Sequence, residues 1–138
     1  QMSELGAKLI LDTLKLIESK RTDFTEQNES QATYAKKIEK SETKINWNDN
    51  AEKIVAKINA FSPNPGCWFE LNRNRIKIIK AKKVIGEGMP GTILNDKFTI
   101  ACSKNAIQII ELQKEGKQKI KADEFLKGNK IKTGQSLN

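Results

Sequence analysis

The spacing of apolar residues changes at one short turn, and this change most constrains the fold. Between residues 51 and 61, apolar side chains recur every three or four positions, which predicts one buried face of an α-helix. Residues 62–66 then end the helix, because proline cannot continue a helix and glycine permits a sharp turn. After Gly66 the apolar residues alternate with polar ones, which predicts β-strands.

Short strands make up most of this second region. The alternation predicts strands at 67–71, 75–84, 92–94, 97–102 and 106–113, a basic loop at 114–121, one helical turn at 123–126 and a polar tail from residue 128. At Ile78 and Ile79 the alternation slips by one residue, which predicts a β-bulge in a coiled strand. Five or six short strands joined by tight turns indicate a small barrel or a sandwich.

The region before the predicted helix at 51–61 is neutral overall and less regular. Residues 3–20 carry an apolar stripe at helical spacing, and we expect this helix to dock onto a domain that is mostly absent from the chain. Residues 21–44 are polar and predict a linker. Asp49 and Glu52 have the spacing of a capping box at the start of the next helix.

The net charge of +8 lies entirely in the second half of the chain. Residues 67–138 contain 15 basic and 7 acidic side chains, whereas residues 1–66 contain 10 of each. The predicted strand at 75–84 and the turn before it place five cations in a row, with no acid among them: Arg73, Arg75, Lys77, Lys80 and Lys82. Such a row can follow a phosphate backbone, although a solvated edge strand kept soluble by lysines has the same pattern.

Two other basic groups are weaker indications of binding. The linker contributes Lys37 and Lys40, whose neighbours include acids. The predicted loop at 114–121 contributes a second patch of four lysines. The aromatic residues all have apolar neighbours, so we expect contact with a nucleic-acid backbone rather than a base-stacking platform.

The chain offers little for catalysis. It contains no histidine, which excludes Ser-His-Asp and Cys-His arrangements and histidine metal ligands. Cys67 and Cys102 lie in apolar runs and are expected to be buried free thiols. The loop at 86–91 lacks the Gly-Lys-Ser/Thr ending of a phosphate loop. No apolar run approaches the length of a membrane span, so we expect a soluble, cytoplasmic protein, and the Gln1-Met2 start suggests a piece of a longer one.

Several strings of residues are distinctive in combination and in order, and together they cover nearly the whole chain. The helix-to-strand turn reads Ala60-Phe61-x-Pro63-x-Pro65-Gly66-x-Trp68, and a later loop reads Pro90-Gly91-Thr92-Ile93-Leu94. Further matching strings lie at 5–14, 29–38, 45–47, 111–113 and 122–126. In these strings the chain resembles the C-terminal portion of methionyl-tRNA formyltransferases. It departs from the common pattern at Asn59, often arginine, and at Asn64, often tryptophan.

The resemblance implies a domain organisation and a fold. Residues 1–21 would be the last helix of the catalytic domain, 22–44 the interdomain linker and 45–138 the C-terminal domain. The implied fold class is α+β and mainly β: a small OB-like Greek-key barrel preceded by a capping helix, with an N-terminal linker helix. That domain would bind initiator tRNA through Arg73, Arg75, Lys77, Lys80, Lys82, Lys37 and Lys40.

The resemblance also implies that cofactor binding and catalysis belong to another domain of the protein. The family's N-terminal domain binds 10-formyltetrahydrofolate and carries a catalytic Asn, His and Asp, none of which can be assigned here. We therefore expect this chain to be inactive alone, to bind no cofactor or metal, and to work as a monomer with that domain of the same protein. The alternatives are the C-terminal module of a sugar-nucleotide formyltransferase and a free-standing OB-type nucleic-acid-binding protein.

Overall fold

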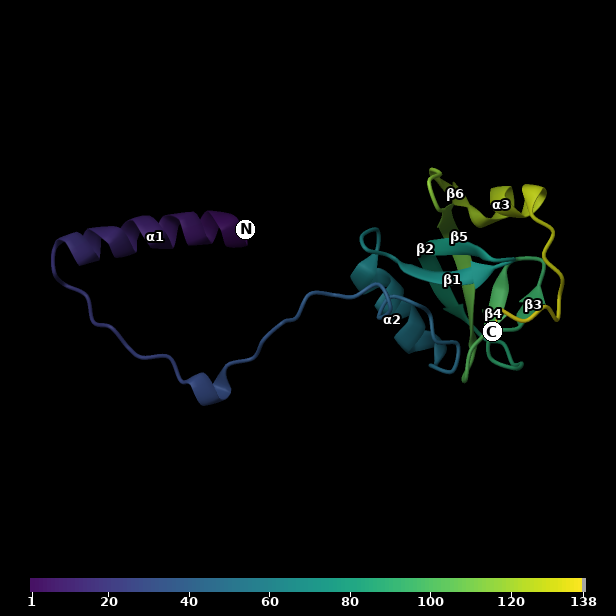
Figure 1. The fold of residues 1–138 in the computed structure, drawn as a ribbon, viewed down its shortest axis with the longest axis horizontal. Coiled ribbons are helices and arrows are strands. Elements are labelled where there is room, and N and C mark those ends of the chain that lie inside the picture. Colours follow the sequence, from purple (N-terminus) through teal and green to yellow (C-terminus); the bar gives the residue numbers. More distant parts are fainter. Residues whose placement is uncertain (138) are drawn as a thin grey trace. The chain divides into compact units, whose positions relative to one another are not determined.

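The computed structural model describes residues 1–137, and the chain divides into two units. The first unit, Gln1–Lys36, contains helix α1 (Met2–Glu18) and one 3₁₀ turn, η1 (Glu29–Gln31) (Figure 1). The predicted N-terminal helix is confirmed. None of its side chains is buried, and Leu5, Leu9 and Leu14 of its apolar stripe are each more than half exposed, at 58%, 55% and 52%.

Helix α2 (Ala51–Phe61) opens the regular structure of the second unit, and its cap differs from the predicted one. The side chain of Asn50 accepts a hydrogen bond from the Lys53 amide at 2.8 Å, so Asn50 is the N-cap. Asp49 instead pairs with the Lys53 ammonium at 2.7 Å. The predicted Asp49–Glu52 capping box is wrong, because Glu52 stands one position too early in the helix to reach back to the cap.

Six strands form one antiparallel sheet, so the mainly-β prediction is confirmed. The strands are β1 (Cys67–Leu71), β2 (Asn74–Val84), β3 (Ile93–Asn95), β4 (Thr99–Ala101), β5 (Ala106–Lys114) and β6 (Lys119–Lys121), and α3 (Ala122–Gly128) follows. Their order is β1-β2-β5-β4-β3, with β6 also paired to β5. Strand β5 thus pairs with β2 along its whole length and shares its other edge between β4 and β6.

The register of β2 against β5 confirms the predicted bulge. Ile78 lies opposite Leu112 and Ala81 opposite Ile109, with irregular pairing at Lys80 between them. Before the bulge, buried side chains fall at Ile76 and Ile78, and after it the next buried side chain is Ala81. The bulge therefore changes which positions of β2 face the core.

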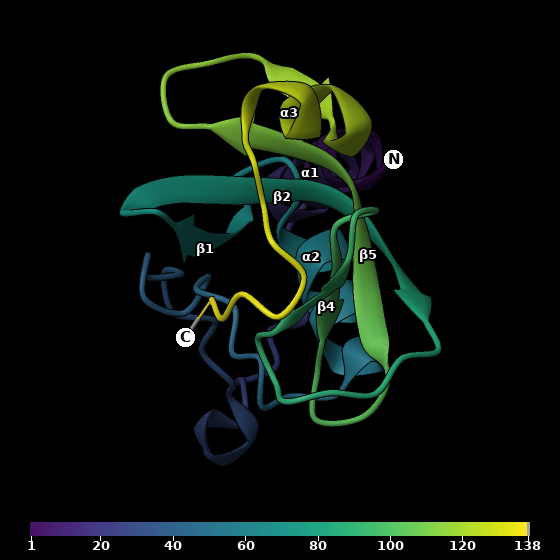
Figure 2. The ribbon, with the colours of Figure 1, turned by 90° about the vertical axis from the view of Figure 1, so that its right-hand side faces the viewer.

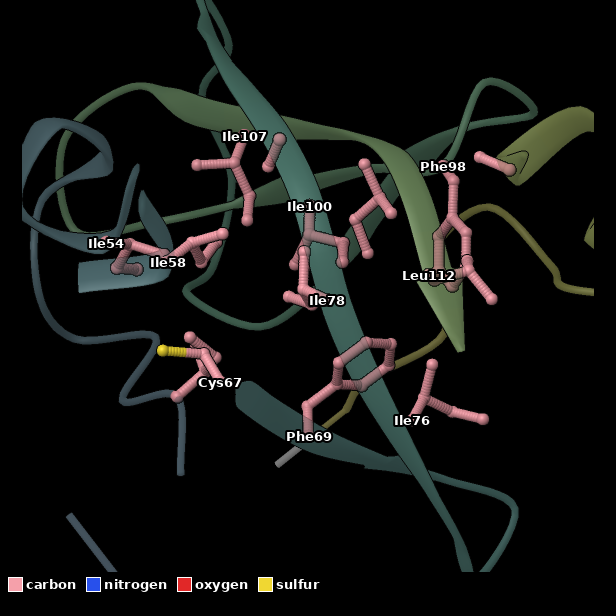
Figure 3. Close-up of a cluster of buried hydrophobic side chains, with 14 of the residues drawn as sticks. Ile54, Ile58, Cys67, Phe69, Ile76, Ile78, Phe98, Ile100, Ile107 and Leu112 are labelled. Carbon is pink, nitrogen blue, oxygen red and sulfur yellow. The ribbon is translucent and has the colours of Figure 1, made fainter. Parts of the chain in front are cut away.

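The core lies between the sheet and the two helices. Figure 3 shows Ile54 and Ile58 of α2 directed toward the same interior as Ile78, Ile100 and Ile107 from the sheet. A chain of ring contacts runs through it from Trp47 to Phe69, Phe98 and Phe125, with centroids 5.8, 6.0 and 5.8 Å apart. Phe125 comes from α3, so both helices share one core with the strands.

The predicted polar tail is docked on the sheet. The Gly134 amide donates to Ile93 O at 2.8 Å, and the Leu137 amide donates to Gly91 O at 2.9 Å. Figure 2 shows this segment in yellow, running back from α3 alongside the strands. The Gln135 amide nitrogen also reaches Asn72 Oδ1, at 3.4 Å, in the β1–β2 turn. The tail therefore lies between β3 and that turn, at the side where no ladder of the described residues joins β3 to β1.

Candidate nucleic-acid interface

Four of the five residues of the predicted cationic row line three different hollows. Arg75 and Lys77 line a hollow of about 250 Å³ together with Lys40, and we call it the Trp68 hollow after its aromatic wall. Arg73 lies in the β1–β2 turn with φ of 61° and lines a second hollow. Lys82 lines a third. Arg73 is therefore separated from Arg75 and Lys77.

The two remaining predicted binding residues are exposed and line none of these three hollows. Lys80 stands at the bulge of β2, opposite Glu111. Lys37 lies at the start of the second unit.

Trp68 is the residue of this interface that the sequence analysis missed. In β1 the side chains of Cys67, Phe69 and Leu71 are buried, so the alternation places Trp68 on the outer face, where it is half-buried. The sequence shows this alternation, but the apolar neighbours on both sides of Trp68 indicated that its side chain belongs to the core. In the ladder Trp68 lies opposite Lys77, which places it diagonally next to Arg75.

The Trp68 side chain organises the cations around it. The Arg75 guanidinium carbon lies 3.8 Å from the ring centroid, and the Lys44 ammonium lies 5.3 Å from it. The indole N–H donates to Lys40 O at 3.1 Å. Backbone bonds from Trp68 N to Thr43 O and from Ile45 N to Trp68 O add to this contact. The end of the predicted linker is thereby fixed along the edge of β1.

The turn before β1 positions Lys77. Gly66 has φ of +79°, and a Cβ atom there would lie 2.5 Å from Lys77 Cδ, so the lysine stem passes directly over the glycine. The Lys77 ammonium donates to Pro63 O at 3.4 Å. The peptide bonds before Pro63 and Pro65 are both cis.

Lys114 of β5 borders this hollow, but its side chain is directed to the other face of the sheet, because Lys114 lies opposite the buried Ile76. Of the four lysines in the predicted patch at 114–121, only Lys114 borders the Trp68 hollow. Its ammonium donates to Asn129 Oδ1 at 2.7 Å and lies 5.1 Å from the Phe125 ring centroid. Lys119 instead sits on β6, 3.9 Å from Glu111.

Acidic residues are closer to the row than the sequence alone indicated. Glu70 lies opposite Arg75 in the ladder, and Glu111 lies opposite Lys80. Glu115 is the one acid that lines the Trp68 hollow, against four cations. In the part of the chain that the structure describes, none of those four cations takes part in an ion pair. The hollow therefore keeps an excess of positive charge.

The thiols show no sign of activation. Both cysteines are buried and free, as predicted. Burial raises the pKa of the Cys102 thiol to about 11 and also raises the pKa of Cys67, so neither is a ready nucleophile at neutral pH. Among residues 1–137, no three His, Cys, Asp or Glu side chains are grouped so that they could hold a metal ion. No helix of that range has both the length and the apolar character to cross a membrane.

Comparison with solved structures shows where this fold occurs. HypX from Aquifex aeolicus, solved in complex with tetrahydrofolic acid, matches with a TM-score of 0.60 and 19% identity over 86% of this chain and 22% of that one. A multiply substituted variant of HypX matches with a TM-score of 0.62 and 20% identity, over 86% and 23% of the two chains. These similarities concern the fold.

Sequence comparison identifies the family. Methionyl-tRNA formyltransferase of Bradyrhizobium diazoefficiens is 39% identical over 97% of this chain and 44% of its own length. That of Pelagibacter ubique is 38% identical over 99% of this chain and 44% of its own length. The chain thus spans less than half the length of these relatives. Residues 37–130 match the model of the formyl transferase C-terminal domain, and the chain belongs to this family.

Proposed function

We propose that this chain is the C-terminal, tRNA-binding part of a methionyl-tRNA formyltransferase. The observation that carries the proposal is the excess of positive charge at the Trp68 hollow, whose cations take part in no ion pair among the described residues, in a chain of this family. In this function the N-terminal domain of the same cytoplasmic, monomeric protein transfers the formyl group from 10-formyltetrahydrofolate to the amine of initiator methionyl-tRNA. This chain positions the tRNA and has no formyltransferase activity alone.

The physical basis is contact with the phosphate backbone. Each lysine or arginine that neutralises a phosphate releases condensed counterions, which gives affinity without reading sequence. Lys80 and Lys82 extend the cationic surface beyond the Trp68 hollow, and both are exposed. Arg73 and Lys37 contribute further positive charge at the margins of this surface.

We also propose that the curved sheet is the OB-like Greek-key barrel that the sequence predicts. Three features support this: the bulge in β2, the sharing of one edge of β5 by two short strands, and the docking of the C-terminal tail beside β3. Bulges and shared long strands are typical of small closed sheets.

The test is the affinity of the chain for initiator tRNA, measured against salt concentration. We expect log K to fall linearly with log[salt], with a slope of about −0.9 for each phosphate neutralised. The double variant Lys80→Gln/Lys82→Gln should weaken binding to initiator and elongator tRNAs to a similar extent. The control Lys104→Gln/Lys130→Gln removes the same charge at exposed sites outside the row. A flat salt dependence for the unaltered chain would contradict the proposal and favour a purely structural role beside a catalytic domain.

A further inference from the structure

We infer that the Trp68 hollow is a binding site for one phosphate group. The inference rests on the proposed function and deepens it, because it assigns a single phosphate to a defined set of side chains. The cations come from two separate segments: Lys40 precedes α2, and Arg75 and Lys77 belong to β2. Only the folded domain brings them to one hollow.

Neutral partners hold most of these cations in place. Arg75 stacks on Trp68 at 3.8 Å, and Lys77 donates to the carbonyl of Pro63 at 3.4 Å. Such contacts restrict the side chains without cancelling their charge. A phosphate oxygen entering the hollow would then accept charge-assisted hydrogen bonds from groups that are already oriented.

The contacts already made by the Trp68 indole ring favour a phosphate over a nucleobase as the ligand of the hollow. A stacked base needs an open ring face, but the guanidinium of Arg75 already lies over the Trp68 ring and the Lys44 ammonium is close to it. The indole N–H is occupied by Lys40 O. The volume of about 250 Å³ is also below the roughly 300–1,000 Å³ typical of sites for drug-sized ligands. A small anion suits the hollow better than a base.

Gly116 keeps part of the rim of the hollow open. It has φ of +69°, and no other described group lies within 4 Å of where its Cβ would be. Positions without side chains allow the close approach of a second backbone, here one that carries phosphates.

The first experiment uses inorganic phosphate and the unaltered chain. The two indole N–H signals in a ¹H–¹⁵N spectrum provide an internal comparison, because Trp47 is in the core at 4% exposure and Trp68 forms the wall of the hollow. On titration with phosphate against chloride at equal ionic strength, we expect a saturable shift of the Trp68 signal and none for Trp47. The absence of a Trp68 shift, or equal shifts of both signals, would overturn the inference.

The second experiment uses tRNA and counts phosphates. If Arg75 and Lys77 share one phosphate, Arg75→Gln/Lys77→Gln should lower the salt slope by about one unit, although two charges are lost, and weaken binding about tenfold or more. The control Lys104→Gln/Lys130→Gln should leave slope and affinity nearly unchanged. A slope change of about two units would overturn the single-phosphate site, as would no change. A retained Trp47 signal in the variant reports that the core is intact.

One further measurement distinguishes the two possible sources of the phosphate group, a terminal monophosphate and an internal phosphodiester. Removing the 5′-terminal phosphate of the tRNA should abolish the effect of the double variant if the site takes a terminal monophosphate, and leave it intact if the site takes an internal phosphodiester. Failure of the proposed function is distinct from failure of this inference. If the chain does not bind tRNA but phosphate still shifts the Trp68 signal, the site stands and the tRNA role falls.

Discussion

Gly66 shows how a single residue connects the fold to the site. Its φ of +79° ends the turn after α2, and its missing side chain leaves room for the stem of Lys77. The sequence already indicated a turn here from the two prolines and the glycine. It could not indicate the second requirement, because Lys77 approaches Gly66 only when β1 and β2 are paired.

Replacing Gly66 with alanine should therefore affect both stability and binding. A non-glycine residue at positive φ costs about 1–2 kcal/mol, and the new Cβ would also displace Lys77. We expect Gly66→Ala to lower the free energy of unfolding by about 2–3 kcal/mol in urea titration and to weaken tRNA binding.

Gly116→Ala is the matched control, since Gly116 has a similar φ of +69° but open space around its Cβ. It should lose only about 1 kcal/mol, because alanine also restricts the unfolded chain. Equal losses of stability in both variants would show that the contact with Lys77 is unimportant.

The buried thiols give a second prediction for single residues. Burial raises the pKa of Cys102 to about 11, so at pH 8 only about one thiol in a thousand is ionised in the folded state. Cys67 is also buried and its pKa is also raised. We expect neither to react with a thiol reagent such as DTNB at pH 8 within minutes, and both to react at once in 8 M urea. Rapid release of one equivalent of chromophore without denaturant would show that one thiol is accessible.

At the scale of elements, the contact between α2 and β2 includes one ion pair across the domain. The Glu52 carboxylate accepts a hydrogen bond from the Lys83 ammonium at 2.8 Å, and this bond is the main reason why the pKa of Glu52 is lowered. A carboxyl group with a lowered pKa in the folded state stabilises the fold above its unfolded pKa, near 4.5. That stabilisation is lost as the pH falls through the folded pKa.

Glu52→Gln should therefore reduce the loss of stability that accompanies a fall in pH on the acidic side of neutrality. In thermal unfolding followed by circular dichroism, we expect the variant and the unaltered chain to differ most near neutral pH and to converge as the pH falls through the lowered folded pKa of Glu52. The effect should be small, because both groups are about half exposed. Glu87→Gln in the exposed loop after β2 is the control, and an identical change of profile there would argue against the Lys83 contact as the cause.

Strong periodicity explains which elements could be predicted. The alternation in β1, β2 and β5 and the helical spacing in α2 each identify an element with one buried face. Strand β6 was missed because its Lys-Ile-Lys sequence contains one apolar residue between two exposed lysines. The tail from residue 134 was missed because its contacts with Gly91 and Ile93 are made by backbone atoms, which leave no side-chain pattern.

Periodicity also explains which residues of the Trp68 hollow could be predicted from the sequence. Arg75 and Lys77 were placed on one face of β2 by alternation, and the structure brings them together with Lys40. Arg73 was joined to them although it was predicted in the turn, because the sequence does not show that its φ is positive. The place of Lys114 at the border of the hollow could not be predicted, because it depends on the register between β2 and β5.

At the scale of the whole molecule, stability is expected to reside in the second unit alone. Every buried side chain of the described residues lies at Thr43 or later, and α1 buries none. The segment from Lys40 to Ile45 belongs to this unit through its bonds to Trp68. Deleting residues 1–36 should therefore leave the free energy of unfolding within about 0.5 kcal/mol of that of the full chain, and should preserve salt-dependent tRNA binding.

A longer deletion separates the linker end from the rest of the first unit. Removing residues 1–45 also removes Ile45, which is 5% exposed, and the hydrogen bonds of Thr43 and Ile45 to Trp68. We expect this variant to lose about 2–4 kcal/mol in urea titration and to bind tRNA more weakly, since Lys40 is lost and Trp68 is no longer held. If the shorter deletion already destabilises the chain to the same extent, residues 1–36 support the domain through contacts that an exposed α1 does not provide. The boundary of the folding unit would then lie upstream of Lys37.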